Sequence, residues 1–278
     1  MLILEAKISI AMKFFCWVVL AAAVVSGCSS DKENKEAPPV PTITYTLIKA
    51  FPHDIQTFTQ GLTVHNGTLY ESTGQQGSWI AEVEIATGTQ NKKVVLKDEY
   101  FGEGITILNN KVYQLTWQSN VGFVYDLKTF EKIGEFNYRH EGWGITSDGK
   151  NLIVSDGTPV LHFLDTVSLK EVSTLQVREN GIAASALNEL EYIDGYIYAN
   201  QWQTQYILKI DPSTGEVVAK MDLSELWNRI LRMNPSADVL NGIAYEKKSK
   251  TFLVTGKYWP VMFALRIQEP KAAAEPAP

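Results

Sequence analysis

The sequence predicts an all-β protein, a five-bladed β-propeller, and two observations lead to that prediction. A short pattern recurs five times at intervals of 40 to 53 residues, which is the usual length of a propeller blade. The stretches between the copies are short, alternating runs rich in β-branched and aromatic residues, without helical periodicity. The five copies begin Gln60-Gly61-Leu62-Thr63, Glu103-Gly104-Ile105-Thr106, Trp143-Gly144-Ile145-Thr146, Asn188-Glu189-Leu190-Glu191 and Asn241-Gly242-Ile243-Ala244.

Each copy is interpreted as four strands joined by short turns. In the second copy we expect strands at residues 104–108, 111–116, 122–126 and 132–136. The outer strands of the third and fourth copies are expected at 170–177 and 216–221. Dipeptides that readily adopt positive φ mark the first turn of four copies: Asn66-Gly67, Asn109-Asn110, Asp148-Gly149 and Asp194-Gly195.

Two segments fall outside the repeat. The fifth copy lacks a fourth strand, and residues 42–51 form an alternating run with no blade of its own. We therefore expect residues 42–51 to pair with the last blade and close the ring, which also covers two open sheet edges. Residues 222–231 carry apolar residues at helical spacing and predict a short helix between blades four and five, capped by Asp222 or Ser224.

The N-terminus resembles a bacterial lipoprotein signal. A positive charge at Lys13 precedes an apolar run over residues 14–25, and small residues then lead to Cys28, the expected site of lipidation. Met12 is an alternative start to Met1. We expect a leader over 1–28, a flexible tether over 29–42, the propeller over 43–268 and a disordered tail over 269–278. We therefore expect a lipid-anchored protein of the bacterial cell envelope, on the periplasmic side or at the cell surface. We also expect a monomer, although the sequence does not fix the oligomeric state.

Composition excludes several kinds of chemistry. The formal net charge is −6, so the chain offers no basic surface for nucleic acid. Its two cysteines, Cys16 and Cys28, both lie in the leader, so the propeller has neither a disulfide nor thiol chemistry. The four histidines show no metal-ligand spacing, and neither a Gly-x-Ser-x-Gly elbow nor a phosphate-binding glycine loop occurs. We expect neither a metal nor a cofactor.

The repeat itself indicates a site, because equivalent positions of successive blades lie on rings around a central channel. The position before the anchor glycine forms the first ring: Gln60, Glu103, Trp143, Asn188 and Asn241. A position just past the second strand forms the second ring: Gly74, Trp117, Gly157, Trp202 and Lys257. Polar groups that converge beside aromatic walls at one mouth of a channel predict a binding pocket there.

Glu103 is the strongest candidate in these rings. It stands between two glycines, which allow the backbone to approach a ligand closely, and an acid is otherwise a poor strand residue. The tryptophans could instead pack between blades. Asn188 and Asn241 could instead form hydrogen bonds to backbone groups at the starts of strands. Tryptophan walls would raise the pKa of Glu103 and Lys257 would lower it, and the sequence leaves that balance open.

Several motifs in order carry a resemblance to a known family: Phe58-Thr59-Gln60-Gly61-Leu62, Phe101-Gly102-Glu103-Gly104, Leu115-Thr116-Trp117, Glu141-Gly142-Trp143-Gly144, Leu187-Asn188-Glu189-Leu190-Glu191, Asn200-Gln201-Trp202 and Thr255-Gly256-Lys257-Tyr258-Trp259-Pro260. Over residues 43–267 the chain resembles the plant-type glutaminyl-peptide cyclotransferases, the papaya glutamine cyclase family. The resemblance implies a five-bladed propeller and metal-free catalysis. It implies Glu103 as the acid/base, with Lys257 as a second catalytic candidate, and it assigns the substrate pocket to Phe58, Gln60, Phe101, Trp117, Trp143, Asn188 and Trp202.

The implied reaction converts the N-terminal glutamine of a peptide or protein to pyroglutamate and releases ammonia. Two alternatives remain open at this point. Glu103, Asn188 and Asn241 could bind Ca²⁺ in a propeller lactonase, although tryptophans and a lysine would crowd that ion. Alternatively, the tryptophan-rich face could bind peptides or glycans without catalysis.

Overall fold

The structure is a computed structural model, and it describes residues 38–270. That part of the chain is built from β-strands and a single helix, so the all-β class is confirmed. The elements, in chain order, are β1 (Thr42–Pro52), β2 (Thr59–His65), β3 (Thr68–Thr73), β4 (Trp79–Glu84), β5 (Thr89–Val95), β6 (Gly102–Leu108), β7 (Lys111–Thr116), β8 (Val121–Asp126), β9 (Lys132–Asn137), β10 (Ile145–Ser147), β11 (Asn151–Ser155), β12 (Val160–Asp165), β13 (Glu171–Gln176), β14 (Arg178–Glu179), β15 (Ile182–Ala183), β16 (Leu187–Ile193), β17 (Tyr196–Gln201), β18 (Tyr206–Ile210), β19 (Val217–Asp222), α1 (Ser224–Met233), β20 (Leu240–Glu246), β21 (Thr251–Gly256) and β22 (Val261–Gln268).

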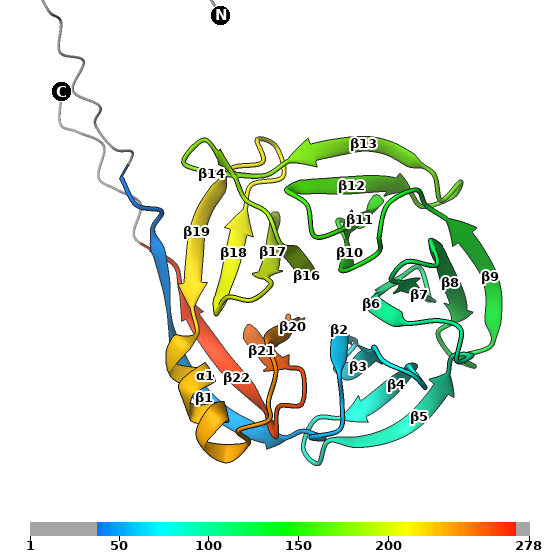
Figure 1. Cartoon of the computed structure of the whole chain (residues 1–278), viewed down its shortest axis with the longest axis horizontal. Coiled ribbons are helices and arrows are strands. Elements are labelled where there is room, and N and C mark those ends of the chain that lie inside the picture. Colours follow the sequence, from blue (N-terminus) through cyan, green and yellow to red (C-terminus); the bar gives the residue numbers. More distant parts are fainter. Residues whose placement is uncertain (1–37, 271–278) are drawn as a thin grey trace, which may run out of the picture. The chain divides into compact units, whose positions relative to one another are not determined.

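The strands pair in the order of the sequence repeat. The first three copies each form a four-stranded antiparallel sheet: β2 to β5, β6 to β9 and β10 to β13. The last two copies share one eight-stranded sheet of order β16-β17-β18-β19-β1-β22-β21-β20. Figure 1 shows these groups around a common centre, with the first strand of each group innermost and β5, β9, β13 and β19 on the outside. Each copy therefore presents its first strand to the centre.

The N-terminal strand closes this arrangement as predicted. β1 runs antiparallel to β22, from the pair Thr44 and Gln268 to the pair Pro52 and Val261. It also runs parallel to β19 through Thr42 and Ile43, a contact that the sequence did not predict. One strand thus satisfies the open edges of both the fourth and the fifth copy, which explains why the fifth copy needs no fourth strand of its own.

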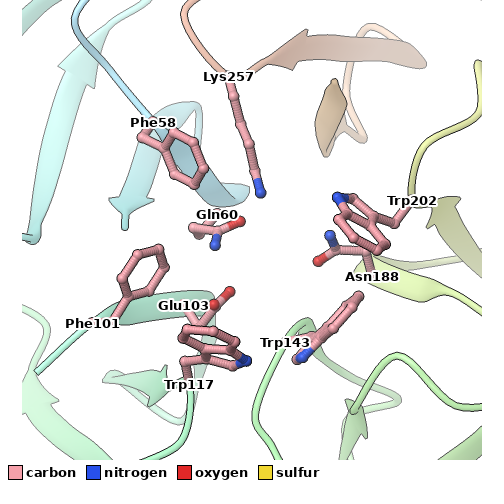
Figure 2. A pocket seen from close by; sticks show the side chains of 9 residues that line it. All are labelled: Phe58, Gln60, Phe101, Glu103, Trp117, Trp143, Asn188, Trp202 and Lys257. Carbon is pink, nitrogen blue, oxygen red and sulfur yellow. The ribbon is translucent and has the colours of Figure 1, made fainter. Parts of the chain in front are cut away.

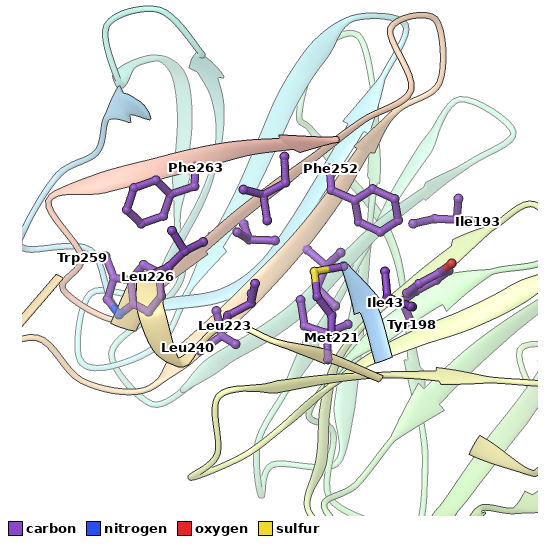
Figure 3. Packing of buried hydrophobic residues seen from close by; sticks show 14 of the residues in the cluster. Ile43, Ile193, Tyr198, Met221, Leu223, Leu226, Leu240, Phe252, Trp259 and Phe263 are labelled. Atoms are coloured by element: carbon purple, nitrogen blue, oxygen red, sulfur yellow. The ribbon is translucent and has the colours of Figure 1, made fainter. Parts of the chain in front are cut away.

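The predicted helix is present, but its start differs from the prediction. α1 covers Ser224–Met233, and its N-cap residue is Leu223, which makes no side-chain cap hydrogen bond. Capping by Asp222 or Ser224 was therefore wrong. Asp222 Oδ1 instead accepts the Ser224 N–H at 2.9 Å in a tight turn ahead of the helix. Leu226 and Ile230 bury the apolar face of the helix in the cluster shown in Figure 3, which also contains Ile43, Leu240, Trp259 and Phe263.

Both ends of the packed domain reach beyond the predicted limits. Val40 is buried and the Pro41 carbonyl accepts the Lys220 N–H at 2.9 Å, although both residues fall in the expected tether. Glu269, expected in the tail, pairs with Lys209 at 2.8 Å. The predicted leader, Cys28 and most of the tether lie outside the described residues, as does the tail beyond residue 270. Within 38–270, no helix is long and apolar enough to cross a membrane.

Close backbone packing at the centre explains the recurrent glycine. A Cβ atom on Gly104 would lie 2.7 Å from the Trp143 carbonyl oxygen of the next copy, which is too close for any side chain. The fourth copy has Glu189 at this position instead. The buried Glu189 carboxylate accepts the N–H of Leu62 at 3.1 Å and that of Ile243 at 2.8 Å, so it links three copies across the centre. The innermost strands are thus held at backbone contact distance.

Candidate functional site

One cavity of about 300 Å³ gathers all of the candidate pocket residues (Figure 2). These residues come from all five copies of the repeat and from the segments that lead into them. Its lining consists of Phe58, Gln60, Phe101, Glu103, Trp117, Trp143, Asn188, Trp202 and Lys257. Asn241, the remaining non-glycine member of the two rings, does not line it.

β-Bulges direct the polar residues of the first ring into this cavity. The register of the innermost strand shifts between Thr59 and Gly61, between Gly102 and Ile105, and between Leu187 and Leu190. Gln60, Glu103 and Asn188 lie within these three shifts. A bulge leaves a residue without a cross-strand partner and redirects its side chain, so each of these three copies turns a polar residue into the cavity.

A repeated backbone hydrogen bond places the second ring beside the first. Trp117 N–H donates to the Phe101 carbonyl at 3.0 Å, and Trp202 N–H donates to the Ala186 carbonyl at 2.8 Å. Lys257 N–H donates to the Val239 carbonyl at 3.0 Å in the same way. Gly74 N–H likewise donates to the Phe58 carbonyl at 2.9 Å. In each case the acceptor lies two residues before a first-ring position, so the two rings are joined by the same contact in four copies.

Glu103 is a buried carboxyl group with only 4% of its surface exposed. Its backbone is fixed, because Ser72 Oγ donates to the Glu103 carbonyl at 2.5 Å and Ser78 Oγ accepts the Gly102 N–H at 2.9 Å. Burial raises the pKa of Glu103 well above its ordinary value; the positive charge of Lys257 opposes this rise and the negative charge of Glu141 adds to it. Burial therefore decides the balance that the sequence left open.

Lys257 is buried on the opposite side of the cavity. Its Nζ lies 4.3 Å from the centre of the Phe58 ring, a cation–π contact. Burial lowers the pKa of Lys257, and the charges of Glu103 and Asp238 only partly offset that effect. Among the described residues no ion pair within 4.0 Å joins Lys257 to Glu103. Glu103 and Lys257 therefore interact electrostatically without direct contact. The raised pKa of Glu103 and the lowered pKa of Lys257 both favour the uncharged form.

Two amide side chains complete the polar part of the site. Asn241 Nδ2 donates to Gln60 Oε1 at 3.1 Å and to the Thr59 carbonyl at 3.1 Å. Because this bond occupies the Gln60 oxygen, the Gln60 NH₂ group is the part left to bind a ligand. Asn188 Oδ1 is buried and has no hydrogen-bond partner in the described chain, so a ligand that supplied one would relieve an unsatisfied polar group.

Aromatic rings form the walls of the cavity. Phe101 contacts both Phe58 and Trp117, with ring centres 6.1 and 5.7 Å apart, and Trp143 packs edge-on against Trp202 at 5.6 Å. Trp143 also covers Gly157, where a Cβ would lie 2.7 Å from its ring. Trp117 and Trp202 remain 37% exposed at the mouth. The result is an aromatic sleeve around a few polar groups.

Sequence reasoning missed the residue that joins two of these walls. The Glu141 carboxylate accepts the indole N–H of Trp117 at 2.7 Å and that of Trp143 at 2.9 Å, both on Oε2. Gln118 Nε2 donates to the other oxygen at 2.9 Å. Burial alone would raise the pKa of Glu141, but the hydrogen bonds from Gln118, Trp143 and Trp117 outweigh it and lower that pKa. The motif Glu141-Gly142-Trp143 was the only signal in the sequence.

The cavity is a poor site for a divalent cation. Of the three ligands considered for Ca²⁺, only Glu103 is a carboxylate, and Asn241 does not face the cavity. Ca²⁺ sites use six to eight oxygen ligands, whereas Lys257 and aromatic carbons occupy most of this wall. The donor set suits an organic ligand with polar nitrogen and oxygen atoms.

A buried acid, a buried lysine and two amides inside an aromatic sleeve are typical of an enzyme active site. The chain belongs to the glutamine cyclotransferase family, whose sequence profile matches residues 19–267. It is 39% identical over 230 residues to a glutaminyl-peptide cyclotransferase of Arabidopsis thaliana, and the match covers 81% of this chain and 72% of the relative. The crystal structure of Myxococcus xanthus glutaminyl cyclase superposes with a TM-score of 0.77 and 35% identity, covering 82% of this chain and 98% of that one. The family resemblance of the motifs is thus confirmed.

Proposed function

We propose that this protein is a glutaminyl-peptide cyclotransferase that cyclises the N-terminal glutamine of peptides and proteins without a metal, with Glu103 as general acid and base. The observation that carries the proposal is the buried Glu103 carboxyl between two amides in a small aromatic cavity. The relatives named above are glutaminyl cyclases, and the nine pocket residues are the ones to which the family resemblance points. We also interpret the five strand groups as the blades of a five-bladed propeller.

The reaction is an intramolecular aminolysis. The free α-amine of the glutamine attacks its own side-chain carboxamide carbon, a C–N bond forms, and a tetrahedral oxyanion results. The C–NH₂ bond then breaks, leaving a five-membered lactam and ammonia. Because nucleophile and electrophile belong to one residue, the pocket gains much of its effect by holding the side chain folded back on the amine.

Glu103 moves the one proton that must change place. As a carboxylate it takes a proton from the attacking nitrogen, and as a carboxylic acid it returns that proton to the departing one. The raised pKa of Glu103 supports both steps, since a carboxylate with a high pKa is a stronger base and its acid form survives nearer neutral pH. Lys257 faces the same carboxyl and keeps its pKa from rising further.

The two amides recognise a carboxamide from both sides. The Gln60 NH₂ group can donate to the substrate carbonyl oxygen and to the oxyanion that replaces it. The unpartnered amide of Asn188 can accept from the substrate NH₂ group. The tryptophan walls pack on the methylene groups of the glutamine side chain, and they also favour its ammonium group before deprotonation.

We retain three further expectations as proposals: Cys28 carries a lipid anchor, the enzyme acts in the bacterial cell envelope, and it is a monomer. The sequence motif at residues 25–28 supports the first two. An anchored enzyme would act on peptides and proteins that reach the envelope with an N-terminal glutamine.

Ammonia release from a glutamine-initiated dipeptide tests the proposal, measured with and without chelator. Glu103→Gln is expected to lower kcat by about 10²- to 10⁴-fold with little change in substrate binding. Glu131→Gln, an exposed acid outside the pocket, is the control and should keep full activity. Unchanged turnover in Glu103→Gln would remove Glu103 from the mechanism, and loss of ammonia release in chelator would overturn catalysis without a metal. No release by folded protein would indicate a binding protein.

A further inference from the structure

A buried histidine that the proposed mechanism does not use lies between two segments that carry pocket residues. His53 follows β1, and its side chain is 4% exposed, while the Glu71 side chain on β3 is 2% exposed. His53 Nε2 lies 3.0 Å from Glu71 Oε1, and neither residue lines the active-site cavity. Taking charged groups out of water is costly unless they are paired and hydrogen-bonded, so the contacts of this pair indicate what it holds in place.

Both ring nitrogens of His53 face acceptors. Nδ1 lies 2.8 Å from the Trp259 carbonyl oxygen, which can only accept, so Nδ1 carries a proton. Nε2 faces the Glu71 oxygen that also accepts the Thr59 hydroxyl at 2.7 Å. Burial alone would lower the pKa of His53, but the charge and hydrogen bond of Glu71 and the bond to Trp259 outweigh it and raise that pKa. The charge of Asp54 acts in the same direction, so these contacts favour an imidazolium.

The Trp259 carbonyl follows the turn that presents Lys257. Within this turn Tyr258 has φ +62°. Left-handed backbone is unfavourable for a bulky side chain, so contacts from outside the turn are needed to stabilise it. His53 supplies two of them, because its ring donates to the Trp259 carbonyl and its backbone N–H donates to the Pro260 carbonyl at 3.0 Å.

The Glu71 side of the pair reaches the segment that carries Phe58 and Gln60. Thr59, whose hydroxyl donates to Glu71, lies between these two pocket residues in the sequence. The Phe58 ring in turn lies 4.3 Å from Lys257 Nζ (Figure 2). The histidine ring therefore joins the turn of the lysine to the segment against which that lysine packs.

We infer that His53, as an imidazolium fixed by Glu71, is a positioning residue that holds Lys257 at its place beside Glu103. The inference rests on the proposed function, in which Glu103 is the acid and base. Burial raises the pKa of Glu103, and the charges that modify this rise are those of Lys257 and Glu141. Because an electrostatic interaction weakens with distance, a displaced lysine would lower that pKa less.

The pKa of Glu103 tests the inference, followed by ¹³C NMR of its carboxyl group, whose signal is identified by its loss in Glu103→Gln. In His53→Gln a single amide nitrogen cannot reach acceptors on both sides of the ring, so Lys257 should move away and the pKa of Glu103 should rise. In a Lys257→Met background, His53→Gln should cause no further rise, as expected for residues that act through one another. His65→Gln on β2 is the matched control and should leave this pKa unchanged.

Glu71→Gln removes the charge of the pair but keeps its geometry. The new NH₂ group can donate both to a neutral His53 Nε2 and to the Thr59 hydroxyl. The pKa of Glu103 should therefore stay close to the wild-type value, while ¹⁵N NMR should show the ring change from an imidazolium to the neutral Nδ1–H form. We expect kcat/KM to fall by up to about 10²-fold in His53→Gln and to remain near the wild-type value in Glu71→Gln.

Thermal melts show whether each variant is folded. An unchanged pKa of Glu103 in folded His53→Gln would overturn the inference, and so would an equal rise in the Lys257→Met background, which would indicate a direct effect of the histidine charge. A neutral His53 ring in the wild type at neutral pH would overturn it too, and this measurement needs no variant that might unfold. The NMR titrations require no turnover, so absence of ammonia release would count against the proposed function alone.

Discussion

The indole N–H of Trp117 donates to the carboxylate of Glu141 across 2.7 Å. Trp143 donates to the same oxygen at 2.9 Å, so a single acid outside the cavity lining holds two of its walls. The same acid contributes a negative charge that raises the pKa of Glu103. Glu141 therefore influences both the shape and the electrostatics of the proposed active site.

Replacing Glu141 with alanine should loosen the substrate pocket. Both indoles lose their acceptor, and a hydrogen bond to a charged group contributes about 1.5–3 kcal/mol. We expect KM for a glutamine-initiated peptide to rise about 10-fold, with kcat changing much less, and the tryptophan fluorescence to shift. The exposed Glu131→Ala serves as the control. An unaltered KM together with an unaltered emission spectrum would contradict this positioning role.

The pH dependence of activity should respond in opposite directions to two substitutions. In the proposed mechanism kcat/KM rises as Glu103 ionises, so its acid limb follows the pKa of Glu103. Lys257 lowers that pKa and Glu141 raises it. Lys257→Met should therefore move the acid limb to higher pH, and Glu141→Gln should move it to lower pH. Profiles of kcat/KM against pH for the three proteins check this, and two shifts of the same sign would be inconsistent with Glu103 as the titrating group.

Gly157→Ala should disturb Trp143 specifically. Gly157 has φ +82°, and a Cβ there would lie 2.7 Å from the Trp143 ring. Gly149 has a similar φ of +87° but open space around it, so Gly149→Ala is a matched control for backbone strain. Both variants should lose about 1 kcal/mol of stability, because alanine is strained in the left-handed backbone conformation that these glycines adopt. Only Gly157→Ala should also raise KM, and equal kinetic effects of the two changes would argue against a substrate-binding role for Trp143.

Glu191 should make the protein less stable as pH rises. Burial raises its pKa to about 8 from an ordinary value of 4.5, with the Tyr245 N–H opposing the rise. Between these values the folded state holds a proton that the unfolded state has lost, so the free energy of unfolding falls with increasing pH. The loss approaches about 1.4 kcal/mol per pH unit for a single proton.

Glu191→Gln removes this titration while leaving an acceptor for the Tyr245 N–H. Denaturant unfolding at several values between pH 5 and 8 should therefore give a shallower slope for Glu191→Gln than for the wild type. Glu131→Gln should retain the wild-type slope. Part of the slope remains in Glu191→Gln, because burial also raises the pKa of Glu189. A slope identical to that of the wild type would show that Glu191 ionises normally in the folded protein.

The sequence alone determined the strand repeat, its closing strand and the ring positions of the pocket, whereas Phe58 and Phe101 were assigned by the family resemblance. These features depend on local rules, since alternation predicts strands and a repeating period places equivalent residues on the same ring. Gln60, Glu103 and Asn188 could be selected because they are polar at equivalent positions of the repeat, where a purely structural repeat would place small or apolar residues. The start of α1 was misplaced because both candidate caps lie within one turn and sequence preference does not separate them.

Only the tertiary structure decided how these residues affect one another. The pKa of Glu103 depends on how completely the neighbouring strand groups exclude water, and the orientation of Gln60 depends on Asn241 from a different sheet. The contacts of Glu141 with the two indoles and the stacking of His140 on His162 likewise arise only from the tertiary structure. Each depends on contacts between groups remote in the chain, and the strength of such contacts is determined by distance and burial, which a linear sequence does not contain.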